Sequence, residues 1–199
     1  MPPIVDLPTL AGKPELARQY ELLARLKDLL EDEPRCLGAA VGGSLASGSA
    51  DEMSDVDLVV YCEVGTAQST LRKLSLAAAD RPVVHRHAGN HDAHSVYEKV
   101  ILRDWTSYEI HVIEPTTRMR LRPPYVKIVD RSGYLASRVA EEKPIGRGTA
   151  RPYVNGDDGL VWELFNCVKW LRRGEAEFTV QYLLALGERL KLRGQHGEV

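Results

Sequence analysis

Cysteine is scarce in this sequence, and long apolar runs are missing from it. The three cysteines, Cys36, Cys62 and Cys167, are odd in number and match no zinc-binding spacing. Each lies in an apolar stretch, which predicts buried free thiols in a reducing compartment. No stretch approaches the roughly eighteen uninterrupted apolar residues of a membrane-spanning helix, and the N-terminus lacks the basic and apolar regions of a secretory signal. We therefore expect a cytoplasmic protein without a membrane partner.

A general excess of positive charge is missing as well. The formal net charge is −2, whereas proteins that bind polynucleotides are usually strongly basic, so nucleic acid is not an expected partner. The charge is nevertheless uneven, because the segment from Lys99 to Arg151 contains eleven lysines or arginines against six aspartates or glutamates. A local excess of this kind suits either a small phosphate-rich ligand or a solvated surface.

Two common nucleotide-binding motifs are also absent. A Walker A loop would require lysine after Gly48, where the sequence has Ser49. No Gly-x-Gly-x-x-Gly pattern follows a predicted strand, so a dinucleotide-binding fold lacks its fingerprint. Any phosphate site in this chain must therefore be built differently.

The hydrophobic pattern predicts an α/β (α+β) part followed by a helical part. Helices are expected at residues 13–32, 69–79, 157–172 and 175–192, and strands at residues 36–41, 55–62, 82–87, 95–103, 106–113 and 125–129. Gly89 and Asn90 are typical of a turn, and Asp157 or Asp158 is expected to cap its helix. We place the boundary between the two parts near residue 130, which gives domains of 1–130 and 131–199.

Two aspartates share one face of the predicted strand 55–62. Because side chains alternate along a strand, Asp55 and Asp57 point the same way, about 6–7 Å apart. Their repulsion is relieved by a divalent cation, and magnesium prefers carboxylate oxygens together with substrate phosphates. Taken alone, the pair would also suit a strand end that takes part in turn hydrogen bonds.

A glycine-rich turn precedes this pair. Gly42 and Gly43 follow a predicted buried strand, and their lack of a side chain allows close backbone approach. The N–H groups of Gly43 and Ser44 open a predicted short helix and form an anion site, to which the Ser44 hydroxyl adds a donor. Phosphates bound there would lie beside the metal.

The stretch from Gly43 to Leu58 resembles the signature of the DNA polymerase β-like nucleotidyltransferase superfamily. That signature is a Gly-Ser turn, a spacer of about ten residues, and Asp-x-Asp between apolar residues. Four further positions resemble the antibiotic-modifying branch, which contains the aminoglycoside and lincosamide nucleotidyltransferases: Ala46, Gly48, Ala50 and Ser54. The resemblance covers about 90 residues well. It implies a mixed central sheet flanked by helices, with the C-terminal helical part completing the substrate cleft.

The resemblance also implies a reaction. A nucleoside monophosphate, AMP from ATP by default, would pass to a hydroxyl of a small molecule such as an antibiotic, releasing pyrophosphate. Asp55 and Asp57 would hold two Mg²⁺ ions. Glu109, in the predicted strand 106–113, matches the third carboxylate by its strand context and would serve as metal ligand or base. Glu98 and Asp104 are weaker candidates for that role.

The nucleotide itself would be bound by several further residues. Beside Gly42, Gly43 and Ser44, the resemblance points to Ser54. Lys143 and Arg147 lie in a loop-like segment, where they would either clamp the triphosphate or remain solvated. In related enzymes a partner subunit can complete the cleft, so a homodimer is one expectation.

The sequence leaves three alternatives open. The same catalytic module can modify a protein hydroxyl, or it can persist as a regulatory or antitoxin-type module that binds nucleotide without transferring it. A metal site in the histidine-rich segment 85–94 is the third, although its spacings fit no standard zinc site. Neither the acceptor nor the choice of triphosphate follows from the sequence.

Overall fold

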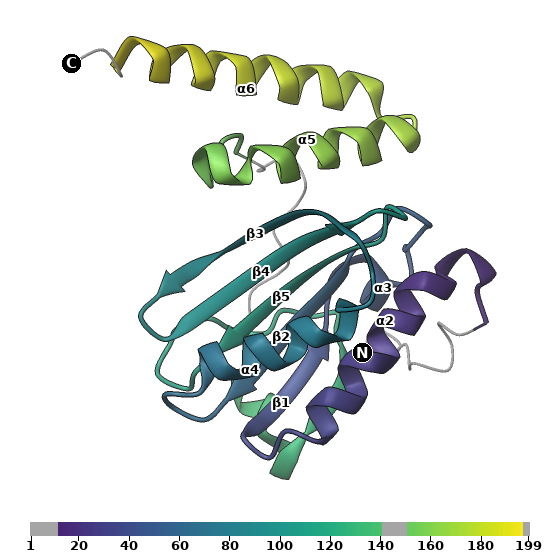
Figure 1. Cartoon of the computed structure of the whole chain (residues 1–199), viewed down its shortest axis with the longest axis vertical. Coiled ribbons are helices and arrows are strands. Elements are labelled where there is room, and N and C mark those ends of the chain that lie inside the picture. The colour runs from purple at the N-terminus through teal and green to yellow at the C-terminus, as the bar shows by residue number, and fades with distance from the viewer. Residues whose placement is uncertain (1–11, 141–150, 197–199) are drawn as a thin grey trace. The chain divides into compact units, whose positions relative to one another are not determined.

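The structure, a computed structural model, describes residues 12–140 and 151–196 and divides into two compact units (Figure 1). The first unit contains a six-stranded sheet and extends through the described residues up to 140; the second is helical and begins in the description at 151. Within the described ranges, no helix is long and apolar enough to cross a lipid bilayer. All three cysteines are buried free thiols, as predicted.

The sheet of the first unit is mixed, as predicted. Its strands are β1 (Cys36–Val41), β2 (Val56–Cys62), β3 (Val83–Asp92), β4 (Ser95–Leu102), β5 (Ser107–Ile113) and β6 (Val126–Asp130). They lie in the order β3-β4-β5-β2-β1-β6. Only β2 and β5 pair in parallel, whereas the other neighbours are antiparallel. The predicted hairpin of β4 and β5 is thus confirmed.

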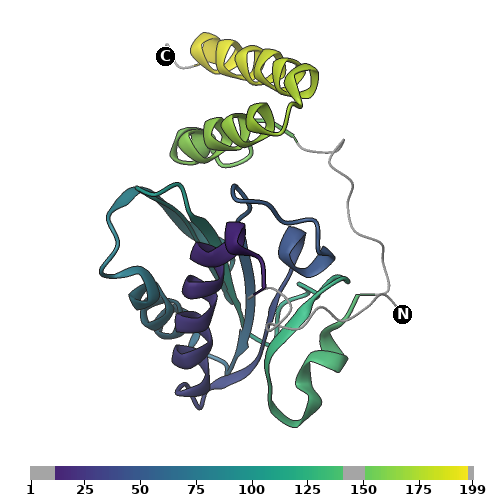
Figure 2. The ribbon, with the colours of Figure 1, turned by 90° about the vertical axis from the view of Figure 1, so that its right-hand side faces the viewer.

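Helices cover one face of this sheet and bury the main core. They are the single turn η1 (Pro14–Leu16), which leads into α2 (Ala17–Glu31), and α4 (Ala67–Leu74), which is followed by η2 (Ser75–Ala78). Both α2 and α4 lie on the same side of the sheet in the turned view of Figure 2. Alternate residues of β2, such as Val56, Leu58 and Val60, pack fully buried in this core. This face therefore supplies most of the hydrophobic stabilisation of the unit.

Gly89 lies inside a strand, so the predicted turn at Gly89 and Asn90 is wrong. Strand β3 continues to Asp92, and Gly89 pairs opposite Tyr97 of β4. A Cβ at Gly89 would lie 2.8 Å from the Tyr97 hydroxyl oxygen. The glycine therefore makes room for a neighbouring ring rather than for a change of chain direction.

The opposite face of the sheet is covered only in part, by the chain that follows β5. Met119 and Leu121 pack there with Tyr61 and Ile113, and the 3₁₀ segment η3 (Arg131–Arg138) places Leu135 against Gly38 of β1. Between this cover and strand β3, the face carries polar side chains. This remainder of the face, which we call the open face, holds the candidate site.

The second unit is a pair of helices, α5 (Gly156–Arg172) and α6 (Ala176–His196). The predicted cap at Asp157 or Asp158 is wrong: Asn155 occupies the cap position, and both aspartates lie in the first turn of α5. The two helices are joined by a hydrogen bond of 2.9 Å from the Tyr182 hydroxyl to Glu163.

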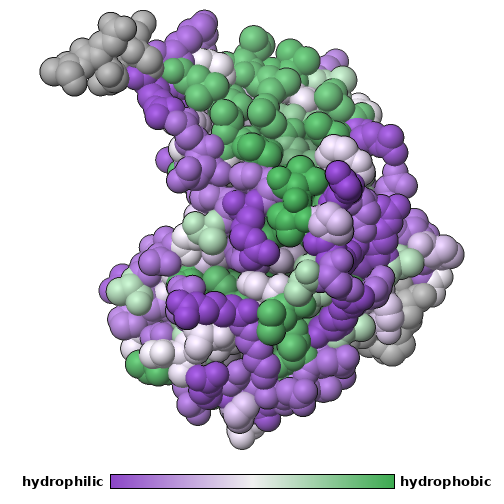
Figure 3. Space-filling model, viewed as in Figure 1, coloured by the Kyte–Doolittle hydropathy of each residue, from purple (hydrophilic) through white to green (hydrophobic). Residues whose placement is uncertain are grey.

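Hydrophobic side chains gather on the surface of both helices (Figure 3). On α5 they form a row at three- and four-residue steps, namely Val161, Leu164, Val168 and Leu171.

Candidate active site

Asp57 and Glu109 are neighbours across the parallel strands β2 and β5. The register pairs Val56 with Tyr108, Asp57 with Glu109, and Leu58 with Ile110. Leu58 and Ile110 are fully buried on the helix-covered face, so the alternation of side chains directs Asp57 and Glu109 to the open face. The sheet thereby brings together two carboxylates that lie 52 positions apart in the sequence.

Gly43 lies directly against the Asp57 side chain. The Gly42 N–H donates to the Asp57 carbonyl oxygen at 2.9 Å, which fixes the turn between β1 and α3 (Gly43–Ser47) beside β2. Gly43 has a φ of +60°, and a Cβ on it would lie 1.9 Å from Asp57 Oδ2. Both the backbone conformation and the contact therefore require glycine at this position.

Asp55 and Ser54 are held by hydrogen bonds at the entrance to β2. The Ser107 hydroxyl of β5 donates to Asp55 Oδ1, so Asp55 is turned toward the neighbouring strand. The Ser54 hydroxyl donates to Asp51 Oδ1 at 3.0 Å and accepts from the Asp51 N–H at 3.0 Å. Ser54 thus closes the turn before β2, and its predicted contact with nucleotide stays a prediction.

Glu109 has two cationic or hydrogen-bonding neighbours on the open face. Its Oε1 lies 2.9 Å from Lys99 Nζ and 2.8 Å from His111 Nε2. Burial acts to raise the pKa of Glu109, but the hydrogen bond from His111 and the charge of Lys99 outweigh it and lower the pKa to about 2. Glu109 is therefore ionised at neutral pH, and so low a pKa makes it a poor proton acceptor.

His111 extends this arrangement toward the sheet edge. Because the Glu109 carboxylate only accepts hydrogen bonds, His111 donates its Nε2–H to Glu109. In this tautomer the Nδ1 atom of His111 accepts a hydrogen bond from His91 Nε2, which lies 2.8 Å away. The two imidazoles stack with centroids 4.9 Å apart. The other described histidines that bond side chains have different partners: His87 bonds Tyr97, and His94 bonds Glu114. The histidines between 85 and 111 therefore do not converge on one point.

A cavity of about 290 Å³ opens above the two carboxylates. It is lined by the glycine turn, by the open face of β2 and β5, and by the chain after β5: Gly42, Gly43, Asp57, Val59, Glu109, His111, Arg120, Leu121 and Arg122. A glycine turn, two acids and two arginines around one cavity suit a ligand that carries phosphate. Of the predicted site residues, Gly42, Gly43, Asp57 and Glu109 line this cavity, whereas Ser44 and Asp55 are not among its lining residues.

The sequence model of the nucleotidyltransferase domain family matches residues 23–134, more than half of the chain. The chain belongs to this family. The match covers the sheet, α4, the part of α2 from residue 23 onward, and the chain after β5 as far as residue 134. It confirms the predicted superfamily and fold and the nucleotidyltransferase type of the domain, but it does not distinguish the antibiotic-modifying branch.

Characterised proteins add little to this assignment. None of the curated proteins matches the sequence. Among solved structures, Cid1, described by its RNA terminal uridylyl transferase activity, is similar at 17% identity with a TM-score of 0.39, over 53% of this chain and 32% of that chain. A cytoplasmic RNA terminal U-transferase is similar at 20% identity with a TM-score of 0.37, over 53% of this chain and 30% of that chain. This nucleotidyltransferase-domain chain thus spans about a third of those structures, and no conclusion about its substrate follows from them.

The residues at the cavity fit a magnesium ion by their chemistry. Asp57 and Glu109 offer hard carboxylate oxygens side by side, with Asp55 two positions earlier on the same face. Within residues 12–140 and 151–196, however, no three His, Cys, Asp or Glu side chains converge closely enough to hold an ion. Glu109 is bonded to Lys99 and His111, and Asp55 to Ser107. Among the described residues, Asp57 and Glu109 would hold such a metal, and Asp55 would join them with its carboxylate oriented by Ser107.

The alternative third acids lie elsewhere. Glu98 is on the helix-covered side, where it bonds the hydroxyl groups of Ser75 and Tyr108. Asp104 sits in the turn between β4 and β5 and pairs with Arg81. Neither adjoins Asp57, so Glu109 is the acid that the fold brings to the cavity. Lys143 and Arg147, predicted to clamp the triphosphate, lie outside the described residues.

Lys99, Arg120 and Arg122 are the cavity neighbours that the sequence did not single out. Lys99 reaches Glu109 only because β4 pairs with β5 in the register that places these residues opposite each other. Arg120 and Arg122 belong to an irregular segment with no motif of its own. Their one sequence signal is the local excess of basic residues between Lys99 and Arg151.

Proposed function

We propose that this chain transfers a nucleoside monophosphate from a nucleoside triphosphate to a hydroxyl group of a small molecule. The observation that carries the proposal is the placement of Asp57 and Glu109 in register, with Gly43 in contact with Asp57. The hydroxyl oxygen would attack the α-phosphorus and lose its proton to solvent, the bond from that phosphorus to the bridging oxygen would break, and pyrophosphate would leave. ATP as donor and an antibiotic as acceptor remain the expectations that the resemblance supplies.

Divalent metal, when bound, would neutralise phosphate charge and lower the pKa of the attacking hydroxyl. The residues of this chain would do the positioning. Asp57 would hold that metal beside the reacting phosphate, and the turn at Gly42 and Gly43 would admit the phosphates close to the backbone. Glu109, with its pKa lowered to about 2, suits the role of a fixed negative charge better than that of a base. The predicted contribution of the helical unit to the cleft is part of this proposal.

The test uses the full chain with Mg²⁺, α-labelled ATP and a panel of small hydroxylated acceptors. Asp57→Asn should abolish transfer of the label, because it removes the carboxylate that faces both the glycine turn and Glu109. Asp28→Asn is the matched control, since Asp28 is exposed on α2. Transfer by Asp57→Asn at the wild-type rate would end the proposal.

A nucleotide-binding regulatory module is the second candidate, and one observation favours it. The third carboxylate is paired with Lys99, whose ammonium group occupies space beside Glu109 that a metal ion could use. Calorimetry with ATP and Mg²⁺, combined with a pyrophosphate-release assay, separates the two functions. Tight binding without release across the acceptor panel would favour the regulatory module.

A further inference from the structure

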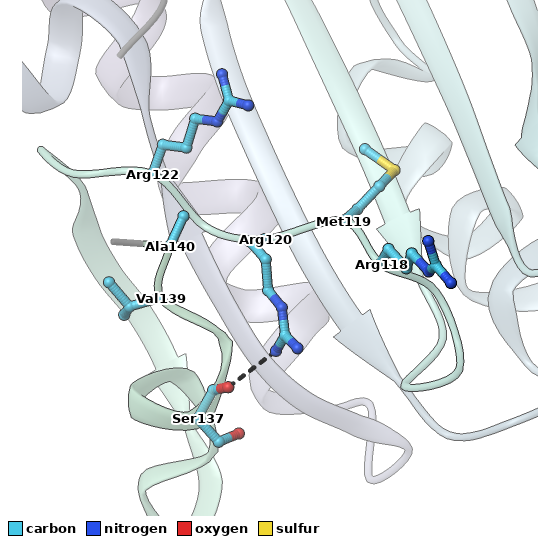
Figure 4. A pocket seen from close by; sticks show the side chains of 7 residues that line it. All are labelled: Arg118, Met119, Arg120, Arg122, Ser137, Val139 and Ala140. Atoms are coloured by element: carbon cyan, nitrogen blue, oxygen red, sulfur yellow. Dashed lines mark hydrogen bonds between the residues drawn. The ribbon is translucent and has the colours of Figure 1, made fainter. Parts of the chain in front are cut away.

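A second and larger cavity, of about 740 Å³, lies beside the candidate active site. It is lined by Arg118, Met119, Arg120, Arg122, Ser137, Val139 and Ala140 (Figure 4). Arg120 and Arg122 line both cavities, so the two cavities adjoin at these side chains. A ligand in the larger cavity would therefore lie next to the cavity that Asp57 and Glu109 line. Its volume lies within the range that binding sites for small molecules occupy.

The arginines of this wall form an alternating set on an extended segment. Leu121 and Met119 point into the apolar cluster beneath, while Arg118, Arg120 and Arg122 are exposed. Figure 4 shows Arg120 directed toward Ser137, whose carbonyl oxygen accepts its hydrogen bond at 3.1 Å, and Arg122 directed the opposite way. The positive charge is thus spread along the cavity. Among the residues the structure describes, no carboxylate pairs with Arg118 or Arg120.

The backbone that carries these arginines is held in place. Buried Arg138 donates to the carbonyl oxygens of Pro115, Thr117 and Met119 at 3.0–3.2 Å, and its guanidinium lies 5.0 Å from the centre of the Tyr61 ring. Leu121 additionally bridges to Val139. Because this backbone is already held, binding of an anion would have to order the arginine side chains but not the chain that carries them.

We propose that this arginine-lined cavity binds a phosphate group of the acceptor, so that the acceptor is a small phosphorylated molecule with a free hydroxyl. The proposal rests on the nucleotidyl transfer proposed above and names its substrate class. Three guanidinium groups disfavour a cationic aminoglycoside, because like charges would be placed together. The net charge of −2 and the limited cavity volume favour a small molecule over a polynucleotide.

The test is a binding measurement that needs no turnover. The full chain is titrated calorimetrically with glucose 6-phosphate, inorganic phosphate and glucose, with and without a saturating non-hydrolysable ATP analogue and Mg²⁺. We expect the two phosphates to bind and glucose not to bind. The double variant Arg118→Gln/Arg120→Gln should weaken phosphate binding at least about tenfold, because each charge-assisted bond to phosphate is strong. The control Arg72→Gln/Arg103→Gln removes two exposed arginines away from the cavity and should bind as wild type.

Several results would overturn the assignment. One is absence of binding by both phosphates, and another is equal binding by the double variant and the wild type. Displacement of glucose 6-phosphate by the ATP analogue would assign the arginines to the triphosphate instead. Binding of a ten-nucleotide single strand more than about tenfold tighter than glucose 6-phosphate, with steep salt dependence, would indicate a polynucleotide acceptor. Asp57→Asn should leave phosphate binding intact, so failure of the proposed reaction and failure of this site are separable.

Discussion

The two faces of the sheet differ in what their side chains do, although they are built from the same strands. On β2, Leu58 and Val60 face α2 and α4 and are fully buried, whereas Asp57 and Val59 are half-exposed on the open face. The helix-covered face is mainly apolar, with Glu98 as a charged exception, and it holds the fold together. The open face places Asp57, Glu109, Lys99 and His111 at or beside a cavity. Partial burial of these polar and charged groups lowers the stability of the fold. Adjacent residues of β2 therefore serve different purposes: Leu58 stabilises the core, whereas Asp57 belongs to the candidate site.

The largest expected difference between the faces is in stability. Leu58→Ala should lower the free energy of unfolding by about 2–5 kcal/mol, because it leaves a cavity in the closed core. Val59→Ala, one residue further on the same strand, should cost about 1 kcal/mol, since Val59 is only partly buried. Urea unfolding of both variants measures the contrast. Equal losses would show that the open face is as tightly packed as the other.

A second prediction concerns Gly43. Gly43→Ala should reduce nucleotidyl transfer by about 100-fold, because the new Cβ collides with Asp57 as well as straining a positive φ. Gly48→Ala is the matched control: its φ of +77° is also positive, but nothing lies within 4 Å of the added Cβ. Initial rates with saturating ATP decide the point. If Gly48→Ala is impaired as strongly, backbone strain alone explains the effect.

Ser107 should matter for the site but little for the core. Ser107→Ala removes the hydrogen bond that orients the Asp55 carboxylate. Because this orientation is lost, the transfer rate should fall by about tenfold. The rate is compared with that of Ser69→Ala, which alters a hydroxyl at the exposed surface of α4. Loss of activity in both variants alike would count against a specific role for Ser107.

The smallest expected effect is on the pH dependence of the free energy of unfolding, to which Glu109 on the open face contributes. In the folded state the pKa of Glu109 is lowered from 4.5 to about 2. The ionised Glu109 therefore stabilises the folded state at pH values above 4.5, and this stabilisation is lost as the pH falls from 4.5 toward 2. Between pH 7 and about pH 3.5, the wild type should lose about 1 kcal/mol more than Glu109→Gln. Urea unfolding in EDTA at the two pH values measures this. Identical losses would mean that Lys99 and His111 do not lower the pKa of Glu109.

Much of the fold followed from local pattern. The apolar periodicity located α2, β1, β2, β4 and β5, and the glycine turn and paired aspartates identified the family. The pattern failed where a local signal had a tertiary cause. Gly89 looked like a turn residue, but it accommodates the Tyr97 ring of the neighbouring strand. Asp157 looked like a cap, but it lies in the first turn of α5 with a hydrogen bond from the Tyr153 hydroxyl.

The sequence by itself determined the chemistry that this chain carries: a glycine turn, two aspartates two positions apart, and strands whose alternation separates an apolar face from a polar one. Only the tertiary structure decided that Glu109 lies beside Asp57, that Lys99 and His111 set its pKa, and that Arg120 and Arg122 close the cavity. The physical reason is register. Which residues become neighbours across a sheet depends on strand order and pairing, and these are set by the packing of the whole core rather than by any local motif.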